Sequence, residues 1–215
     1  MKNILQIGFV SSLVAISLSF IFSDLFQVCE WKTMDLRYKI RGEIKTDSRL
    51  IMIDADDKSS KHYGRWPWKR DVHASMINIL TELGAETVMY DVLFAYPTEA
   101  SADDKLTLAT KLARNIIFPV AINLGDKDHD IENRNNSSLL IHSINKLDSN
   151  SVNFKTLKDS ILPLNSLLNV SHGLGHIASN RDGDGIIRRV PLLVSYHNRL
   201  LPSLAFNGLL KYLKI

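Results

Sequence analysis

The feature that most constrains this sequence is an uncharged apolar run near its N-terminus. Residues 4–22 read ILQIGFVSSLVAISLSFIF and contain no charged side chain. About 20 apolar residues in a helix cross the roughly 30 Å hydrocarbon core of a bilayer. The run therefore predicts an uncleaved transmembrane helix over residues 4–23. Because positive charge favours the cytoplasmic side, Lys2 predicts a cytoplasmic N-terminus over residues 1–3, with the remainder of the chain outside.

Two other interpretations of the apolar run stay open. A cleaved signal peptide also carries such a run and ends at small residues, and Ser17-Leu18-Ser19 imitates a cleavage site. A lipid anchor on Cys29 is a weaker alternative, because the preceding Val28 is larger than the residue usual there. The length of the run favours the uncleaved anchor over both.

Composition excludes several kinds of site. Cys29 is the only cysteine, so the chain forms no intramolecular disulfide and holds no site built from several thiolates. The net charge of +3 comes from scattered basic residues and gives no indication of a nucleic-acid partner. A hydrophobic content of 45% with 23% charged residues is typical of a globular protein.

Three short apolar segments predict buried strands. They are RLIMID at residues 49–54, TVMYD at 87–91 and NIIFPVAI at 115–122. Helical patterns separate them, so the order predicts parallel pairing with right-handed crossovers. Pro119 within the third segment indicates a strand near the sheet edge or a bulge.

Helices are predicted before and between these strands. Residues 24–48 read as a connecting helix that could continue the membrane helix as a rigid stalk. Asp71 begins a second helix that Gly84 ends, and a third lies near residues 104–114. The apolar residues that recur at helical spacing in the second helix are Val72, Met76, Ile79 and Leu83.

The second half of the chain has a polar insertion followed by a return to regular structure. Residues 123–157 read as a long, partly mobile surface insertion. Residues 172–179 and 186–195 predict an antiparallel hairpin, and a final helix begins at Pro202 or Ser203. The predicted fold class is three-layer α/β. It has a mixed, mostly parallel sheet with flanking helices and an added C-terminal hairpin, preceded by one transmembrane helix.

Two carboxylates are expected to lie side by side. Asp54 and Asp91 end two consecutive predicted strands, and neighbouring strands lie about 4.8 Å apart at the edge where open α/β sheets bind ligands. Such a pair needs a cation, a shared proton or a basic partner. The alternative, which we favour, is that both acids bond loop backbone and arginines. The possible basic partners are Arg65, Arg70 and Arg188.

The segment GRWPW at residues 64–68 is expected to overhang that site. Pro67 holds Trp66 extended, and residues two apart in extended chain point the same way, so Trp66 and Trp68 face one side together. They would form an aromatic lid over a ligand, a membrane-interface anchor, or an apolar plug over the sheet edge. The plug is favoured, because large aromatics most often serve packing.

The run from Asp182 to Gly185 alternates acids with glycines. Calcium loops use this spacing, but the third acid and the distal glutamate are missing, so the run favours a turn. The scattered histidines form no catalytic arrangement; His73 reads as a surface or capping residue, and no nucleotide-binding or hydrolase motif is present. We predict no enzyme, no cofactor and no metal site. The candidate ligand-binding residues are Asp54, Trp66, Trp68, Arg70, Asp91, Asp184 and Arg188.

Several short motifs together resemble the CHASE2 family of extracytoplasmic sensor domains. The first are Arg37-Tyr38, Arg41-Gly42, Ile53-Asp54, Gly64-Arg65-Trp66-Pro67-Trp68, Arg70, His73-Ala74, Gly84-Ala85, Asp91 and Phe94. In order along the chain follow Gly175-His176, Asp182-Gly183-Asp184-Gly185, Arg188-Arg189-Val190-Pro191 and Pro202-Ser203-Leu204. No single match is strong; their order and spacing carry the resemblance.

The resemblance implies the periplasmic input domain of a bacterial receptor, single-pass in the inner membrane, with the sensor domain over residues 49–215. It also implies an unknown small-molecule ligand and an output partner such as a cyclase or a kinase. The family's later glycine- and lysine-rich strand motif, its further membrane helices and its output module are not in this sequence. We therefore expect a stand-alone or truncated sensor. The alternative is a non-catalytic interaction or structural protein of the envelope.

Overall fold

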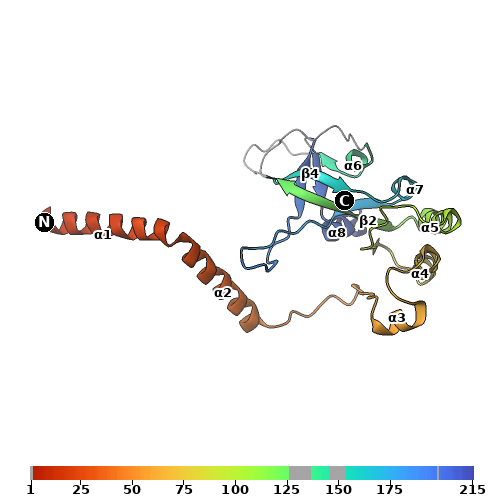
Figure 1. The fold of residues 1–215 in the computed structure, drawn as a ribbon, viewed down its shortest axis with the longest axis horizontal. Helices are drawn as coiled ribbons and strands as arrows, with labels where there is room; N and C mark the ends of the chain where they lie inside the picture. The colour runs from red at the N-terminus through yellow and green to blue at the C-terminus, as the bar shows by residue number, and fades with distance from the viewer. Residues whose placement is uncertain (1, 126–136, 146–153, 198) are drawn as a thin grey trace. The chain divides into compact units, whose positions relative to one another are not determined.

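The computed structural model describes residues 2–125, 137–145, 154–197 and 199–215. Contacts divide the chain into two compact units, Met1–Asp54 and Ala55–Ile215 (Figure 1). The two units are described separately. Of the predicted polar insertion, residues 126–136 and 146–153 lie outside the described residues.

The N-terminal unit consists of two helices and an extended tail. Helix α1 spans Lys2–Ile21 and helix α2 spans Ser23–Arg41. The helix predicted over residues 4–23 is present, whereas its crossing of a membrane remains a prediction. By length and hydropathy, no single helix among the described residues could cross a bilayer. Only the pair Gln6–Leu18 and Ser23–Arg41 could do so together, and it is bent by 75°. Of the connecting helix predicted over residues 24–48, the structure has a helix up to Arg41 and none over residues 42–48. The bend does not fit a straight, rigid continuation of α1.

The first predicted strand is wrong. Residues 49–54 contain no strand, and Ile51 and Met52 are 82% and 94% exposed. The only local order is a turn in which Leu50 N–H donates to the Asp47 carbonyl at 3.0 Å. A short apolar segment forms a strand only where another strand pairs with it. None of the described strands pairs with residues 49–54.

The second unit is built on a mixed sheet. Its strands are β1 (Val88–Met89), β2 (Ile116–Gly125), β3 (Ile144–Asn145), β4 (Thr156–Ile161), β5 (Gly173–His176), β6 (Leu193–Tyr196) and β7 (Arg199–Pro202). Their order is β1-β2-β4-β6-β7-β3, with β5 also paired to β2. Parallel pairs (β1-β2, β2-β5 and β4-β6) are as many as antiparallel ones (β2-β4, β6-β7 and β3-β7). A mixed sheet is confirmed, but a mostly parallel one is not.

Strand β2 is central, so the edge position predicted from Pro119 is wrong. Val88 and Tyr90 N–H groups donate to the carbonyls of Asn115 and Ile117, so odd-numbered residues of β2 face β1. The β1 register ends at Ile117. Pro119 faces the same side but lies beyond the last residue of β2 that pairs with β1. Its lack of an N–H therefore costs no hydrogen bond between β1 and β2. The register irregularity of β2 lies between Asn123 and Leu124 instead.

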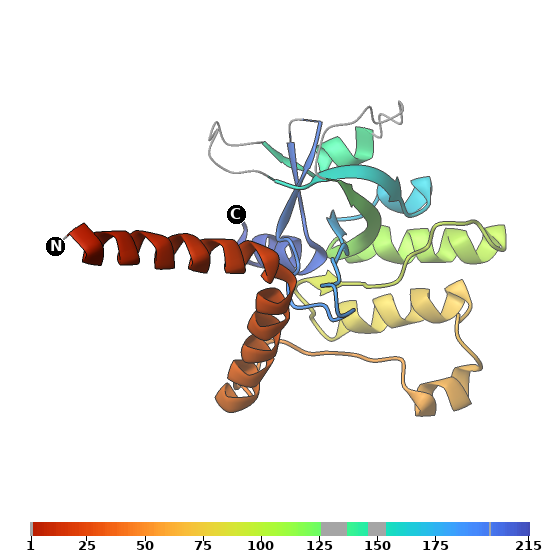
Figure 2. The same cartoon turned by 60° about the vertical axis from the view of Figure 1, so that its left-hand side comes forward.

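Helices cover both faces of β1, β2 and β5 (Figure 2). Helix α8 (Leu204–Leu213) packs closely on one face. A Cβ on Gly208 would meet the Met89 side chain, and a Cβ on Gly173 would meet the Asn207 side chain. Side chains of the other face enter the main core with helices α4 (Arg70–Glu82), α5 (Ala100–Ala113) and α7 (Asn165–Leu168). The three-layer arrangement is therefore confirmed for this part of the sheet. Two short helices complete the unit, α3 (Asp57–Tyr63) and α6 (Ser137–Ile141).

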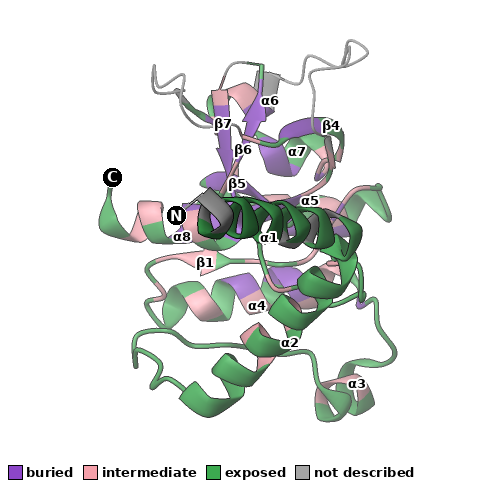
Figure 3. Ribbon diagram, turned by 90° about the vertical axis from the view of Figure 1, so that its left-hand side faces the viewer, coloured by how far each residue is buried: buried purple, intermediate pink, exposed green. Residues whose placement is uncertain are grey.

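The helix ends follow the predicted signals, but the predicted face of α4 is wrong. Ser203 Oγ caps α8 by accepting the Phe206 N–H at 3.3 Å, and Gly84 takes a φ of 78° just after α4. The buried residues of α4 are His73, Ala74 and Ile77. Ile79 of the predicted apolar stripe and Leu83, which follows α4, are exposed, so this segment carries apolar residues on two sides. Figure 3 shows both buried and exposed residues along α4.

The predicted C-terminal hairpin is present at a different place. Residues 173–176 form β5, which pairs in parallel with β2, and only an isolated bridge joins Asn180 to Arg189. The antiparallel hairpin consists of β6 and β7, paired from Leu193–Pro202 to Tyr196–Arg199. The Asp-Gly run forms a loop between β5, which pairs with β2, and β6, which pairs with β7, so it is not the turn of a hairpin. The sequence therefore identified the turn but not the strands that pair on either side of it.

Candidate functional site

The segment between α3 and α4 brings aromatic rings together. The Trp66 and Trp68 rings lie 5.3 Å apart, and Tyr63 is also 5.3 Å from Trp68. The two tryptophans lie together as predicted, but the extended chain predicted for them is wrong, because residues 65–67 form a bend and the Trp66–Pro67 peptide bond is cis. Trp68 is 9% exposed and its indole N–H donates to the Gly64 carbonyl at 2.8 Å, whereas Trp66 is 44% exposed. We call the set of Tyr63, Trp66, Trp68, His73, Tyr90 and Phe94 the aromatic cluster.

His73 lies at the centre of the aromatic cluster, contrary to the surface position predicted for it. Its ring is 5.6 Å from Trp66 and 5.0 Å from Phe94, and Nδ1 lies 2.8 Å from the Tyr90 hydroxyl. Burial, aided by the charge of Arg70, lowers the pKa of His73 to about 4, although a hydrogen bond to the Trp68 backbone opposes the shift. Burial also raises the pKa of Tyr90. Both groups are therefore neutral near pH 7.

Acidification is expected to weaken the fold through His73. The folded pKa is about 4 and the unfolded one 6.5, so between these values the unfolded chain binds more protons and the free energy of unfolding falls as the pH drops. Between roughly pH 7 and pH 4.5, the free energy of unfolding should fall by about 2 kcal/mol less in His73→Phe than in the wild type. Denaturant unfolding at the two pH values measures it. An unchanged pH dependence in His73→Phe would contradict the assignment.

Arg70 is held by a carboxylate from the neighbouring helix. Its Nε lies 3.1 Å from Asp103 Oδ1, its guanidinium carbon lies 4.3 Å from the Phe94 ring centre, and Nη2 donates to the Tyr96 carbonyl at 3.0 Å. Burial works to raise the pKa of Asp103, but hydrogen bonds from Thr98 and Arg70 outweigh it and lower the pKa. Arg70 thus fixes the start of α4 beneath the aromatic cluster, with its charge already balanced.

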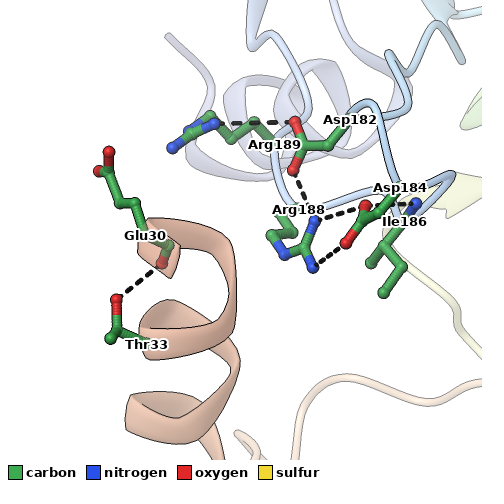
Figure 4. A network of polar contacts seen from close by, with 7 residues as sticks. All are labelled: Glu30, Thr33, Asp182, Asp184, Ile186, Arg188 and Arg189. Atoms are coloured by element: carbon green, nitrogen blue, oxygen red, sulfur yellow. Dashed lines mark hydrogen bonds and ion pairs between the residues drawn. The ribbon is translucent and has the colours of Figure 1, made fainter. Parts of the chain in front are cut away.

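Asp184 and Arg188 are paired with each other. The Arg188 guanidinium donates to Asp184 Oδ2 at 2.7 Å, to Asp184 Oδ1 at 2.9 Å and to Asp182 Oδ2 at 2.9 Å (Figure 4). Gly185 N–H donates to the Asp182 carbonyl at 2.8 Å, and Gly185 has a φ of 84°. The favoured prediction of a turn is confirmed.

The argument that placed Asp54 beside Asp91 loses its basis. Asp54 ends no strand and lies in the N-terminal unit, whereas Asp91 is an exposed residue just after β1 in the second unit. Of the candidate ligand residues, the structure brings together Trp66, Trp68 and Arg70 in one place and Asp184 and Arg188 in another. Among the residues described, no group of three His, Cys, Asp or Glu side chains is arranged to hold a metal ion.

A separate pocket lies between α4 and α5. Asp71 and Lys105 line this pocket and form an ion pair of 3.0 Å. None of the candidate ligand residues lines the pocket. The candidate list from the sequence omitted four members of the aromatic cluster and the carboxylate that pairs with Arg70, namely Tyr63, His73, Tyr90, Phe94 and Asp103. For His73 a signal existed, because it lies four residues before Ile77 on the buried face of α4. Asp103 is 33 residues from Arg70, and no local pattern links them.

Comparison with family models identifies one match. The model described as the CHASE2 domain covers residues 10–215, which is nearly the whole chain and includes the aromatic cluster and the Arg188 loop. Comparison with curated proteins and with solved structures gave no match. The family is one of extracytoplasmic sensor domains. On this evidence, the chain belongs to the CHASE2 domain family.

Proposed function

We propose that this chain is a membrane-anchored sensory input domain for bacterial signal transduction. The family match over residues 10–215 is the observation that carries the proposal. In this account the apolar run of residues 4–22 anchors the chain in the inner membrane as a single pass, although α1 alone does not meet the length and hydropathy of a membrane span, and Ala55–Ile215 lies in the periplasm. The chain has no catalytic role of its own and acts on a cyclase or kinase partner.

Trp66 is the proposed contact for a small ligand. An indole that is 44% exposed, yet packs at 5.3 Å on Trp68 and 5.6 Å on His73, offers a flat apolar face that its neighbours hold in place. Trp68 and Arg70 position this face, since the first bonds to Gly64 and the second is paired with Asp103. Asp91 is the exposed acid that remains a candidate for contact with a cationic group.

Ligand binding at Trp66 would act on the start of α4. The Trp66–Trp68 segment leads directly into Arg70, which contacts Phe94, Tyr96 and Asp103 of the following segments. A ligand that shifts the segment therefore biases the packing of α4 against α5. Calorimetric titration of the full-length chain, with and without Trp66→Ala, tests the proposal.

The second candidate function is that of an envelope interaction module. It is favoured by Ile79 of α4 and by Leu83 just after it, which are both exposed. Two variants separate the functions. A ligand site loses small-molecule heat in Trp66→Ala, whereas an interaction surface loses capture of a protein partner in Ile79→Asn/Leu83→Asn and shows no small-molecule heat in the wild type.

A further inference from the structure

Helix α2 carries an apolar stripe that no other described residue of the N-terminal unit buries. No residue of α2 is buried. Residues spaced by three and four positions share one side of a helix, and on α2 these include apolar side chains that are each more than half exposed. The stripe consists of Leu25, Phe26, Leu36 and Ile40, with the exposed Cys29 at its centre.

Basic side chains border this stripe. Lys32 and Lys39 lie seven residues apart along one side, and Arg37 lies on the other, with Nε donating to the Thr33 carbonyl at 3.3 Å. By helical spacing, Asp24 and Asp35 lie away from the stripe, and Glu30 borders it on the Arg37 side. Compensation of the helix dipole accounts for Lys39 and Arg41 in the last turn but not for Lys32.

The chain bends where α2 begins. Phe22 breaks the helix with φ −105° and ψ 23°, and the two helical segments are bent by 75°. If the apolar run of residues 4–22 inserts across the bilayer, as in the proposed function on which this step rests, a bend of this size places α2 close to the membrane plane. An amphipathic helix in that plane buries its apolar side at the headgroup boundary, and lysine and arginine stems reach outward to the phosphates.

We infer that α2 is an interfacial helix that binds the surface of a bilayer containing anionic lipids. The stripe enters the acyl boundary, while Lys32, Arg37 and Lys39 contact the headgroup phosphates. The extended tail that follows keeps further apolar side chains exposed, with Ile44 and Leu50 among them. The stalk predicted from the sequence is therefore a membrane-surface helix, which holds the folded unit near the lipid.

A second copy of the chain is the competing occupant. Phe26, Cys29, Thr33, Leu36 and Ile40 follow the 3-4 spacing of a coiled-coil seam. In a parallel dimer with this seam, Lys32 of one copy would face Arg37 of the other, twice per dimer. Like charges at these flanking positions oppose pairing, whereas both residues suit an anionic surface.

Cys29 allows a direct test in the full-length chain. A nitroxide attached to Cys29 reports whether it lies in lipid or in water, from its collisions with oxygen and with a water-soluble nickel complex. The protein is reconstituted into vesicles of phosphatidylcholine with phosphatidylglycerol, or of phosphatidylcholine alone. The basic variant is Lys32→Gln/Arg37→Gln/Lys39→Gln. The control moves the label to the other side of α2 with Gln27→Cys in a Cys29→Ser background.

With anionic lipid, we expect oxygen collisions at Cys29 to dominate and nickel collisions to be several-fold lower than at the Gln27→Cys control. Nickel collisions at Cys29 should rise several-fold in the basic variant and in phosphatidylcholine alone. A water-exposed Cys29 in anionic vesicles, or spin–spin broadening between copies, would overturn the inference. Failure of the anchor looks different, because the wild-type chain would then not float with vesicles of either composition.

Discussion

Gly175→Ala is expected to lower the free energy of unfolding by about 3 kcal/mol or more, at the upper end of what overpacking costs. A Cβ at Gly175 would contact the Leu204 Cα, would lie 2.6 Å from the Leu204 nitrogen and 2.9 Å from the Ser203 carbonyl carbon. These are backbone atoms at the start of α8, so no side-chain rotation relieves the clash. Strand β5 and α8 must separate, which opens one layer of the fold. Denaturant unfolding of the full-length chain measures the loss.

Two other glycines provide matched controls for this prediction. A Cβ on Gly208 would also contact its neighbour, but that neighbour is the flexible thioether of Met89, so Gly208→Ala should cost clearly less than Gly175→Ala. Gly8→Ala meets no atom within 4 Å and should leave the unfolding of the second unit unchanged. Equal losses for Gly175→Ala and Gly208→Ala would contradict backbone contact as the cause.

Asp103→Ala is expected to destabilise the second unit by about 2–3 kcal/mol, below the cost of breaking a fully buried pair, because it leaves a half-buried guanidinium without its carboxylate partner. The Arg70 and Asp103 side chains are only 13% and 12% exposed, and their atoms lie 3.1 Å apart. Asp103 also accepts the Thr98 N–H at 2.7 Å. Its removal therefore frees both α4 and the segment that precedes α5. Equilibrium unfolding by circular dichroism measures the change.

The same two helices supply the control for Asp103. Asp71 of α4 and Lys105 of α5 form a largely exposed ion pair of 3.0 Å, and Asp71→Ala should cost no more than about 1 kcal/mol. The double variant Arg70→Met/Asp103→Leu removes both buried charges and should recover much of the loss. A cost for Asp103→Ala as small as that for Asp71→Ala would show that the pair is not buried in solution.

The longer helices and two of the strands were predictable because their signals are local, whereas the short helices α3, α6 and α7 were not predicted. Gly84 and Ser203 mark helix ends by backbone geometry and capping, and both are confirmed. The apolar segment at 87–91 contains β1 and that at 115–122 contains most of β2, which supplies core residues. Residues 49–54 have the same composition, but nothing in a segment's own sequence says whether a partner strand pairs with it. Strand pairing was the part that could not be predicted.

The candidate site shows the same division. The closeness of Trp66 and Trp68 was predicted and their rings are 5.3 Å apart, but the chain around Pro67 is bent and not extended as predicted. The burial of His73 depends on which of two apolar faces of α4 meets the sheet, and this is settled by packing across the domain. The Arg70–Asp103 pair joins residues on different helices. Sequence therefore identified the tryptophans and Arg70. It missed His73, Tyr90 and Asp103, whose contacts hold them in place.

The central claim is that the segment around Trp66 senses a small molecule. Calorimetry of the full-length chain in detergent with divalent cations, amino acids and small carboxylic acids tests it most directly. We predict a heat of binding that is lost in Trp66→Ala and kept in Tyr96→Ala, since the Tyr96 side chain is exposed outside the aromatic cluster. A ligand that gives the same heat with Trp66→Ala as with the wild type, or no heat from any compound with the wild type, would contradict the claim.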